Sequence, residues 1–290
     1  MRDTLEEFRR LDFSKSSSSQ IIDIITDCPV AIVPYIIKGA YILRARRGKG
    51  FKERSEMTYC PAQLCTGYQR ASLPGETMFY GVISDDQNHQ ENARAICASE
   101  CSTLCAEGME SIGREFFTLS YWKIKEPLKV FSLITDTTFP NVQNNKMLNL
   151  MRENFLTIHK DSSDYEKKLA HFISDDFSKR VIDNKEYMLS ATLTTEIIND
   201  MGFDGVVYPS VKLSGQCGLN IALKPSSVDS KLEFTYVVDQ VLYKNKDHSI
   251  CRVENKTEKG KDTKIHLQFP DEVILEQLGI NSIEDLPIIE

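Results

Sequence analysis

The chain has 290 residues, of which 41% are hydrophobic and 27% are charged, as in an ordinary globular protein with a substantial core. Its formal net charge of −7 argues against direct nucleic-acid binding, because an acidic surface repels phosphate backbones. The eight cysteines form no Cys-x-x-Cys pair, so we expect neither a metal site nor disulfides.

The first 40 residues predict helices followed by a strand. Residues 1–13 are charged and amphipathic, unlike a signal peptide, so we expect a cytoplasmic protein. The most apolar stretch, residues 21–43, contains Asp23 and two prolines, and we therefore expect no membrane span. Residues 1–39 are predicted to form an N-terminal helical extension.

The remaining elements are strands and helices in no regular order. Predicted strands cover residues 41–46, 78–83, 116–124, 128–134, 205–211, 219–223 and 231–243. Predicted helices cover residues 92–107, 165–177 and 192–201, with short helices from residue 271 onwards. Because no βαβ repeat is present, we predict an α+β fold with a mixed sheet and flanking helices. Residues 40–230 would form the main domain, and residues 231–290 a C-terminal strand and helix extension of the same globule.

Glu100 is the most informative single position. Its helical neighbours Ile96, Cys97 and Leu104 are apolar, so the carboxylate lies inside an apolar stripe. A buried carboxylate needs a cation, a set of donors or a ligand. The pattern alone favours a functional carboxylate and a structural ion pair equally. Glu91, in contrast, has mostly polar neighbours and is typical of a solvated face.

Four other positions carry weaker signals. Arg44 and Arg46 share one face of a predicted strand and could clamp a diphosphate, although a solvated basic face is the commoner explanation. Arg70 precedes a Pro-Gly turn, and Tyr80 ends the strand that follows, where a core position is the commoner role. Residues 208–223 match neither a nucleophile elbow nor a Rossmann or Walker A loop.

Taken in order, four segments resemble the RES domain family over roughly residues 40–225. They are YILRAR (41–46), QRASLPGETMFYG (69–81), AICASE (95–100) and GFDGVVYPSVKLSGQCGLNIAL (202–223). The resemblance matches Arg44, Arg70, Tyr80, Glu100 and Ser210 to the family's arginines, tyrosine, glutamate and serine. Glu91 also fits the spacing of compact members, but the apolar stripe favours Glu100.

The resemblance implies a fold like that of ADP-ribosyltransferase toxins and an enzyme that cleaves the nicotinamide–ribose bond of NAD. NAD would be the substrate, with no cofactor, and many members pair with an antitoxin. Glu100 would stabilise the transition state, Arg44, Arg46 and Arg70 would hold the diphosphate, and Tyr80 would pack on nicotinamide. Ser210 would hydrogen-bond the nicotinamide amide or its ribose, with Asn220 as a further binding residue.

Two alternatives stay open at this point. A protein ADP-ribosyltransferase could use the extra helices at 140–185 to dock its target. A non-catalytic module could bind a nucleotide or a partner through its acidic surface. The sequence leaves open whether water, phosphate or a protein is the acceptor, and whether the chain forms a homo-oligomer.

Overall fold

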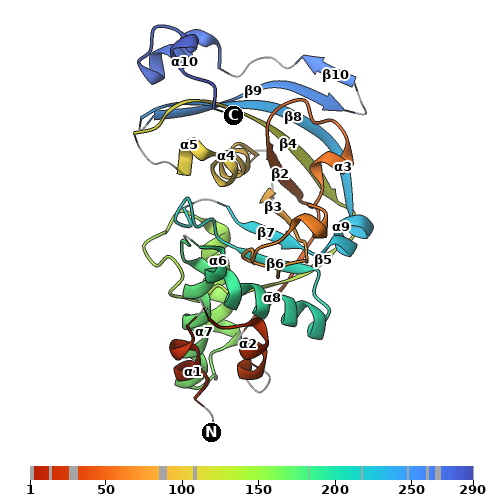
Figure 1. Ribbon diagram of the computed structural model, residues 1–290, viewed down its shortest axis with the longest axis vertical. Helices are drawn as coiled ribbons and strands as arrows, with labels where there is room; N and C mark the ends of the chain where they lie inside the picture. Colours follow the sequence, from red (N-terminus) through yellow and green to blue (C-terminus); the bar gives the residue numbers. More distant parts are fainter. Residues whose placement is uncertain are drawn as a thin grey trace. The chain divides into compact units, whose positions relative to one another are not determined.

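A computed structural model of the chain places its helices and strands in two compact units (Figure 1). The structure describes residues 3–12, 15–25, 32–84, 90–106, 110–181, 183–216, 218–246, 248–258, 261–264 and 269–289. Unit 1 consists of Met1–Lys38, Tyr59–Tyr80 and Glu126–Lys231, and unit 2 of Gly39–Thr58, Gly81–Lys125 and Leu232–Glu290. Each unit is therefore assembled from three separate stretches of chain.

Unit 1 combines four strands with most of the helices. Its elements are α1 (Thr4–Arg10), α2 (Ser18–Ile25), β1 (Val33–Ile37), η1 (Ala62–Leu64), β5 (Leu128–Ser132), α6 (Lys146–Ile158), α7 (Asp164–Ser178), η3 (Asn184–Tyr187), α8 (Met188–Met201), β6 (Gly205–Tyr208), β7 (Asn220–Leu223) and α9 (Pro225–Lys231). The strands lie in the order β1-β5-β6-β7. The β5–β6 pair is parallel and the other pairs are antiparallel, so the sheet is mixed.

The core of unit 1 lies between this sheet and the helices. Leu5 and Phe8 of α1 and Ile21 of α2 are buried in the same cluster as residues of α7 and α8. The N-terminal helices are therefore an integral part of this unit. Helix α8 ends at Gly202 in the left-handed conformation (φ 66°), as its sequence position predicts.

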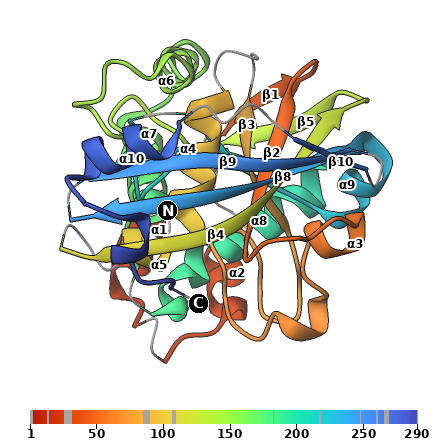
Figure 2. The same cartoon turned by 90° about the horizontal axis from the view of Figure 1, so that it is seen from above.

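Unit 2 is built around long antiparallel strands. Its elements are β2 (Tyr41–Arg47), α3 (Arg54–Met57), most of β3 (Phe79–Ser84), α4 (Gln90–Cys101), α5 (Thr103–Ala106), β4 (Ile112–Ile124), β8 (Leu232–Asn245), β9 (His248–Glu258), β10 (Lys261–Lys264), α10 (Asp271–Leu278) and η4 (Ile283–Asp285). The strand order is β3-β2-β4-β8-β9-β10, with antiparallel pairing throughout the described registers. Figure 2 shows β4, β8 and β9 running side by side.

Helices cover both faces of the sheet in unit 2. Helices α4 and α5 lie on one side and α10 on the other (Figure 1). Two thiols fix α4 along β2, because Cys97 Sγ donates to the Leu43 carbonyl (3.4 Å) and Cys101 Sγ to the Ala45 carbonyl (3.6 Å). The spacing of four residues on the helix thus matches two residues on the strand.

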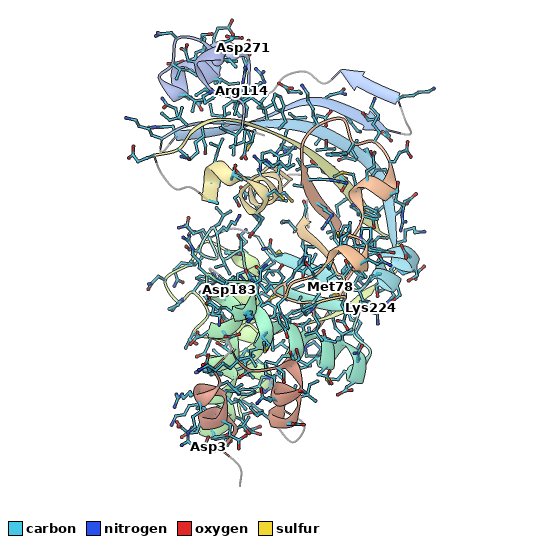
Figure 3. The ribbon with its side chains drawn as sticks, in the orientation of Figure 1. Asp3, Met78, Arg114, Asp183, Lys224 and Asp271 are labelled. Atoms are coloured by element: carbon cyan, nitrogen blue, oxygen red, sulfur yellow. The ribbon has the colours of Figure 1, made fainter. Side chains whose placement is uncertain are left out.

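The C-terminal residues belong to unit 2. Arg114 and Asp271, labelled in Figure 3, lie at the end of the unit that α10 covers. The amide of Arg114 donates to the Pro287 carbonyl (2.8 Å), and the amide of Ile289 donates to the Arg114 carbonyl (2.9 Å). The last residues therefore extend the backbone pairing of β4.

The prediction of one continuous helix over residues 92–107 is wrong, because the structure has two helices there. Helix α4 ends at Cys101, and α5 begins at Thr103. The amides of Thr103 and Leu104 donate to the carboxylate of Glu115 (3.1 and 3.4 Å). A side chain has replaced the carbonyls that these amides would bond in a continuous helix.

The fold class is α+β, with a mixed sheet and flanking helices, as predicted. Within the described part of the chain, no helix combines the length and apolar character needed to cross a membrane.

Candidate functional site

The residues singled out in the sequence are divided between the two units. Arg44, Arg46 and Glu100 belong to unit 2. Unit 1 contains the other four, namely Arg70, Tyr80, Ser210 and Asn220. The residues of each unit are therefore described separately.

Glu100 and Arg44 belong to α4 and β2, two elements that pack on each other. Glu100 is half-buried, and its helical neighbours Ile96, Cys97 and Leu104 are buried, as the apolar stripe predicts. Burial raises the pKa of the Cys97 thiol, the Glu100 carboxylate raises it further, and the Arg44 guanidinium lowers it. Both charges therefore act on the same buried thiol.

Arg46 has a local set of contacts. Its Nη1 donates to the Glu56 carbonyl (2.7 Å), and its guanidinium lies 4.4 Å from the centre of the Phe51 ring. The side chain is exposed and packs on the segment that follows β2. Its contact with a phosphate stays a prediction.

Glu91, the other candidate glutamate, lies in α4, but its side chain is outside the described residues. The choice between Glu91 and Glu100 therefore rests on the sequence pattern and on the surroundings of Glu100.

Arg70 lies in a cage of three aromatic rings in unit 1, formed by Phe177, Tyr187 and Tyr208, which we call the Arg70 cage. The guanidinium carbon is 4.8 Å from the centre of the Tyr187 ring and 5.8 and 5.9 Å from those of Tyr208 and Phe177. Its nitrogens donate to the carbonyls of Phe177 and Lys179 and to the Tyr187 hydroxyl. Arg70 thus satisfies carbonyls at the C-terminal end of α7.

Tyr80 adjoins this arginine and is tied to the turn that contains it. Its hydroxyl accepts from the Ala71 amide (3.2 Å) and is hydrogen-bonded to Ser72 Oγ (3.1 Å). Burial raises the pKa of Tyr80 to about 12, against the opposing effects of these hydrogen bonds and of the Arg70 charge. The phenol is therefore a neutral group at physiological pH.

Ser210 and Asn220 lie at one end of the β6–β7 pair. Ser210 is fully buried, and its Oγ accepts from the Leu213 amide (3.3 Å). Asn220 is opposite Tyr208 in the β6–β7 register. Since Tyr208 also contributes a ring to the Arg70 cage, the structure brings the unit 1 candidates together around the end of β6.

The sequence analysis missed a second carboxylate on an apolar face. Glu115 in β4 is 0% exposed and accepts from Ser102 Oγ, from Thr103 Oγ1 and from the amides of Thr103 and Leu104. Arg47 pairs with it at 3.3 Å. Burial raises the pKa of Glu115, but the hydrogen bonds from Ser102 and Thr103 outweigh burial, and the net shift is downward.

The described residues contain no cluster of three or more histidine, cysteine or carboxylate side chains that could hold a metal ion. Cys28 and Cys217 lie outside the described residues. The six described cysteines form no disulfide with one another.

Comparison with protein-family models finds none that matches the chain, and no curated protein is significantly similar to it. The resemblance to the RES domain family therefore rests on the sequence segments quoted above.

Proposed function

We propose that this chain is a RES-type enzyme that binds NAD and cleaves its nicotinamide–ribose bond, as a glycohydrolase or a phosphorylase. The observation that carries the proposal is Glu100, a half-buried carboxylate among buried apolar residues of α4, the helix that packs on the strand containing Arg44. A half-buried carboxylate is suited to stabilise a cationic sugar centre, and a guanidinium is suited to bind an anionic diphosphate.

The chemistry requires little acid catalysis. The C–N bond breaks with its electron pair moving to the pyridinium nitrogen, so nicotinamide leaves as a neutral molecule. The ribose carbon becomes oxocarbenium-like, as in glycoside hydrolysis. An oxygen of water or phosphate then bonds to that carbon and loses its proton. In this scheme Glu100 stabilises the positive charge or orients the nucleophile, and Arg44 binds the diphosphate.

The resemblance also implies roles for residues of unit 1. Ser210, with Asn220 nearby, would hydrogen-bond the nicotinamide amide or its ribose, and Tyr80 would pack against the ring. Arg70 has its donors on Phe177, Lys179 and Tyr187, which favours a role in holding the aromatic cage over direct contact with phosphate. Arg46 would add positive charge beside Arg44.

The deciding experiment is incubation of the purified chain with NAD, with and without inorganic phosphate, followed by product analysis. Nicotinamide with ADP-ribose indicates hydrolysis, and nicotinamide with a phosphorylated ADP-ribose indicates phosphorolysis. Radiolabel transferred from NAD to a protein would instead indicate ADP-ribosyl transfer. Intact NAD after long incubation at high protein concentration would overturn the proposal and favour the binding module.

Glu100→Gln tests the assignment of the carboxylate. Its loss should lower kcat by about 10²–10³-fold, the size found for one electrostatic group, with an unchanged thermal melt. Glu233→Gln is a matched control, because Glu233 is exposed on β8 of the same unit. Near-normal turnover in Glu100→Gln together with an inactive Glu91→Gln would show that Glu91 is the family glutamate.

The proposal extends to the setting in which such an enzyme acts. Consumption of NAD in the cytoplasm would make the chain a bacterial toxin or defence effector, restrained by an antitoxin partner. Expression of the active chain alone should then deplete cellular NAD, while Glu100→Gln should not. Equal NAD levels with the two proteins would contradict this role.

A further inference from the structure

Two loops of unit 1 contain unusual backbone conformations. The β5–α6 loop comprises residues 133–145, and the described part of the β6–β7 loop comprises residues 209–216, 218 and 219. Among the described residues, Phe139 (φ 49°), Ser214 (φ 50°) and Lys246 (φ 55°) are the non-glycine residues with positive φ. Lys246 is at the turn between β8 and β9, but Phe139 and Ser214 lie in these two loops. A left-handed aromatic residue costs free energy, and such strain gathers at ligand clamps.

Arg152 of α6 holds the strained backbone of the β5–α6 loop. Its Nε and Nη2 donate to the Thr138 carbonyl (3.0 and 2.6 Å), and its Nη1 donates to the Val142 carbonyl (2.8 Å). Nη2 also donates to the carbonyl of Phe139 itself. Thr138 Oγ1 is hydrogen-bonded to Ser174 Oγ of α7 (2.6 Å). The conformation of Phe139 is thus fixed from both sides.

The ring of Phe139 occupies the place of a side chain at Gly215 in the β6–β7 loop. A Cβ added to Gly215 would lie 2.7 Å from the ring, and Gly215 itself has φ 72°. Asn145 holds the same loop, because its Nδ2 donates to the carbonyls of Gly215 (2.9 Å) and Gly218 (3.0 Å). Its Oδ1 accepts from the Leu148 amide (3.1 Å) and caps α6.

Gly215 connects these contacts to Ser210. The Gly215 amide donates to the Ser210 carbonyl (2.8 Å), and the Leu213 amide donates to Ser210 Oγ (3.3 Å). A continuous series of contacts therefore runs from Arg152 through Phe139 and Gly215 to Ser210.

We infer that Phe139 and Asn145 are positioning residues for the β6–β7 loop, holding Ser210 and its turn in the conformation that receives the nicotinamide riboside half of the substrate. This inference rests on the proposed function. Neither residue contacts the substrate in this scheme, and both act through Gly215.

Amide hydrogen exchange tests, without any substrate, whether Phe139 and Asn145 hold the β6–β7 loop. Phe139→Ala and Asn145→Asp should each speed exchange at the Gly215 amide by about tenfold or more, with little change in β5. Asn145→Asp keeps the oxygen that caps α6 and removes both donors to the loop. Phe172→Ala is the matched control, because Phe172 is also half-buried in unit 1 but stacks on Phe8. Unchanged exchange at Gly215 in both loop variants would overturn the inference.

Binding and kinetics test the functional part. In Phe139→Ala, kcat/KM for NAD should fall by about tenfold, while affinity for ADP-ribose, which lacks nicotinamide, should change less than twofold. Phe139→Tyr retains the ring and should restore both exchange and turnover. Equal losses for NAD and ADP-ribose would indicate a general structural defect and overturn the positioning role.

The two proposals fail in different ways. If the unaltered chain does not cleave NAD, the proposed function is wrong, and the substrate-positioning role is wrong with it. The exchange experiment then still tests the contact between the two loops. If the chain cleaves NAD and the variants exchange faster at Gly215 but turn over normally, only the positioning inference is wrong.

Discussion

Glu115 is a charge buried between β4 and the start of α5. Four hydrogen bonds from residues 102–104 and the ion pair with Arg47 surround the carboxylate. Donors of this kind favour the ionised form and offset the cost of removing it from water. The same contacts fix the point at which α4 ends and α5 begins, so a single side chain determines the local course of the chain.

Replacing Glu115 by glutamine should destabilise unit 2 in a pH-dependent way. At pH 7 the free energy of unfolding should fall by about 3 kcal/mol, the scale of lost charge-assisted bonds in a buried site. Because the folded pKa of Glu115 is below the ordinary value of a glutamate, its charge stabilises the fold above that ordinary pKa. This contribution is lost as the pH falls through the folded value.

Urea denaturation of the chain and of Glu115→Gln at pH 7 and near pH 3.5 measures the effect. The difference between the two proteins should narrow at the lower pH. Glu233→Gln, at an exposed position on β8, should show little change at either pH. A difference that stays constant with pH would mean that the charge of Glu115 contributes nothing.

The two buried-face carboxylates show what the sequence can reveal about a site. Glu100 was found because a helical period places it among Ile96, Cys97 and Leu104. Glu115 shares a face with Phe117 in β4, but the strand was expected to begin at residue 116, four positions after its actual start and just beyond Glu115. Alternation identifies a carboxylate on an apolar face only when the strand boundary is right. Its partners could not be predicted, because they depend on the break between α4 and α5.

At the scale of elements, the end of α7 depends on a residue far away in the sequence. The Phe177 and Lys179 carbonyls accept from Arg70, and the three rings of the Arg70 cage enclose its guanidinium. The planar guanidinium can donate in several directions while stacking on aromatic faces, which lysine cannot reproduce.

Arg70→Lys should therefore destabilise unit 1 although it keeps the charge. We expect a loss of about 2 kcal/mol in the free energy of unfolding, from lost hydrogen bonds and stacking. Arg180→Lys is the control, because Arg180 is exposed and makes one described hydrogen bond, to the Lys212 carbonyl. Equal stability of Arg70→Lys and the unaltered chain, measured by chemical denaturation, would contradict a structural role.

Most elements followed from local sequence patterns. Helix α7 begins after Ser163, whose hydroxyl accepts from the Glu166 amide, close to the expected start at residue 165. Strands β2, β4 and β8 cover the stretches where apolar residues gather. The contacts around Arg70 could not be predicted in this way, because its hydrogen-bond partners lie 107 or more positions along the chain.

At the scale of the whole molecule, the course of the chain between the units is the least predictable feature. The sequence suggested an N-terminal extension, a main domain and a C-terminal extension in succession. The structure instead builds each unit from three stretches, with the chain passing from unit 1 to unit 2 inside β3. Linear patterns report local periodicity and contain no information on which distant stretches pack together.

A chain beginning at Gly39 should lose the fold of unit 1. The truncation removes α1, α2 and β1, and with them Leu5, Phe8, Ile21 and Ile24 from the unit 1 core. Burial of such side chains stabilises a fold by about 1.5–3 kcal/mol each, so the loss of four is comparable to the whole stability of a typical domain. We expect an insoluble or non-cooperatively melting protein.

Expression, solubility and a thermal melt of the truncated chain test this expectation. A chain beginning at Asp3, just ahead of α1, is the control and should melt like the full chain. A soluble Gly39–Glu290 chain with an unchanged cooperative melt would show that the N-terminal helices are dispensable.

The interleaved course of the chain also sets the order in which the protein can fold as the ribosome makes it. The Leu5 amide donates to the Tyr165 hydroxyl, 160 positions later, and unit 1 is incomplete until Lys231 has been synthesised. The folding of unit 2 cannot be completed until later, because the backbone of Arg114 is hydrogen-bonded to Pro287 and Ile289. The apolar faces of the first two helices therefore leave the exit tunnel long before their partners exist. Chaperones that bind nascent apolar segments should recognise residues 3–25 early in synthesis, and unit 1 should fold only after residues up to Lys231 have left the tunnel.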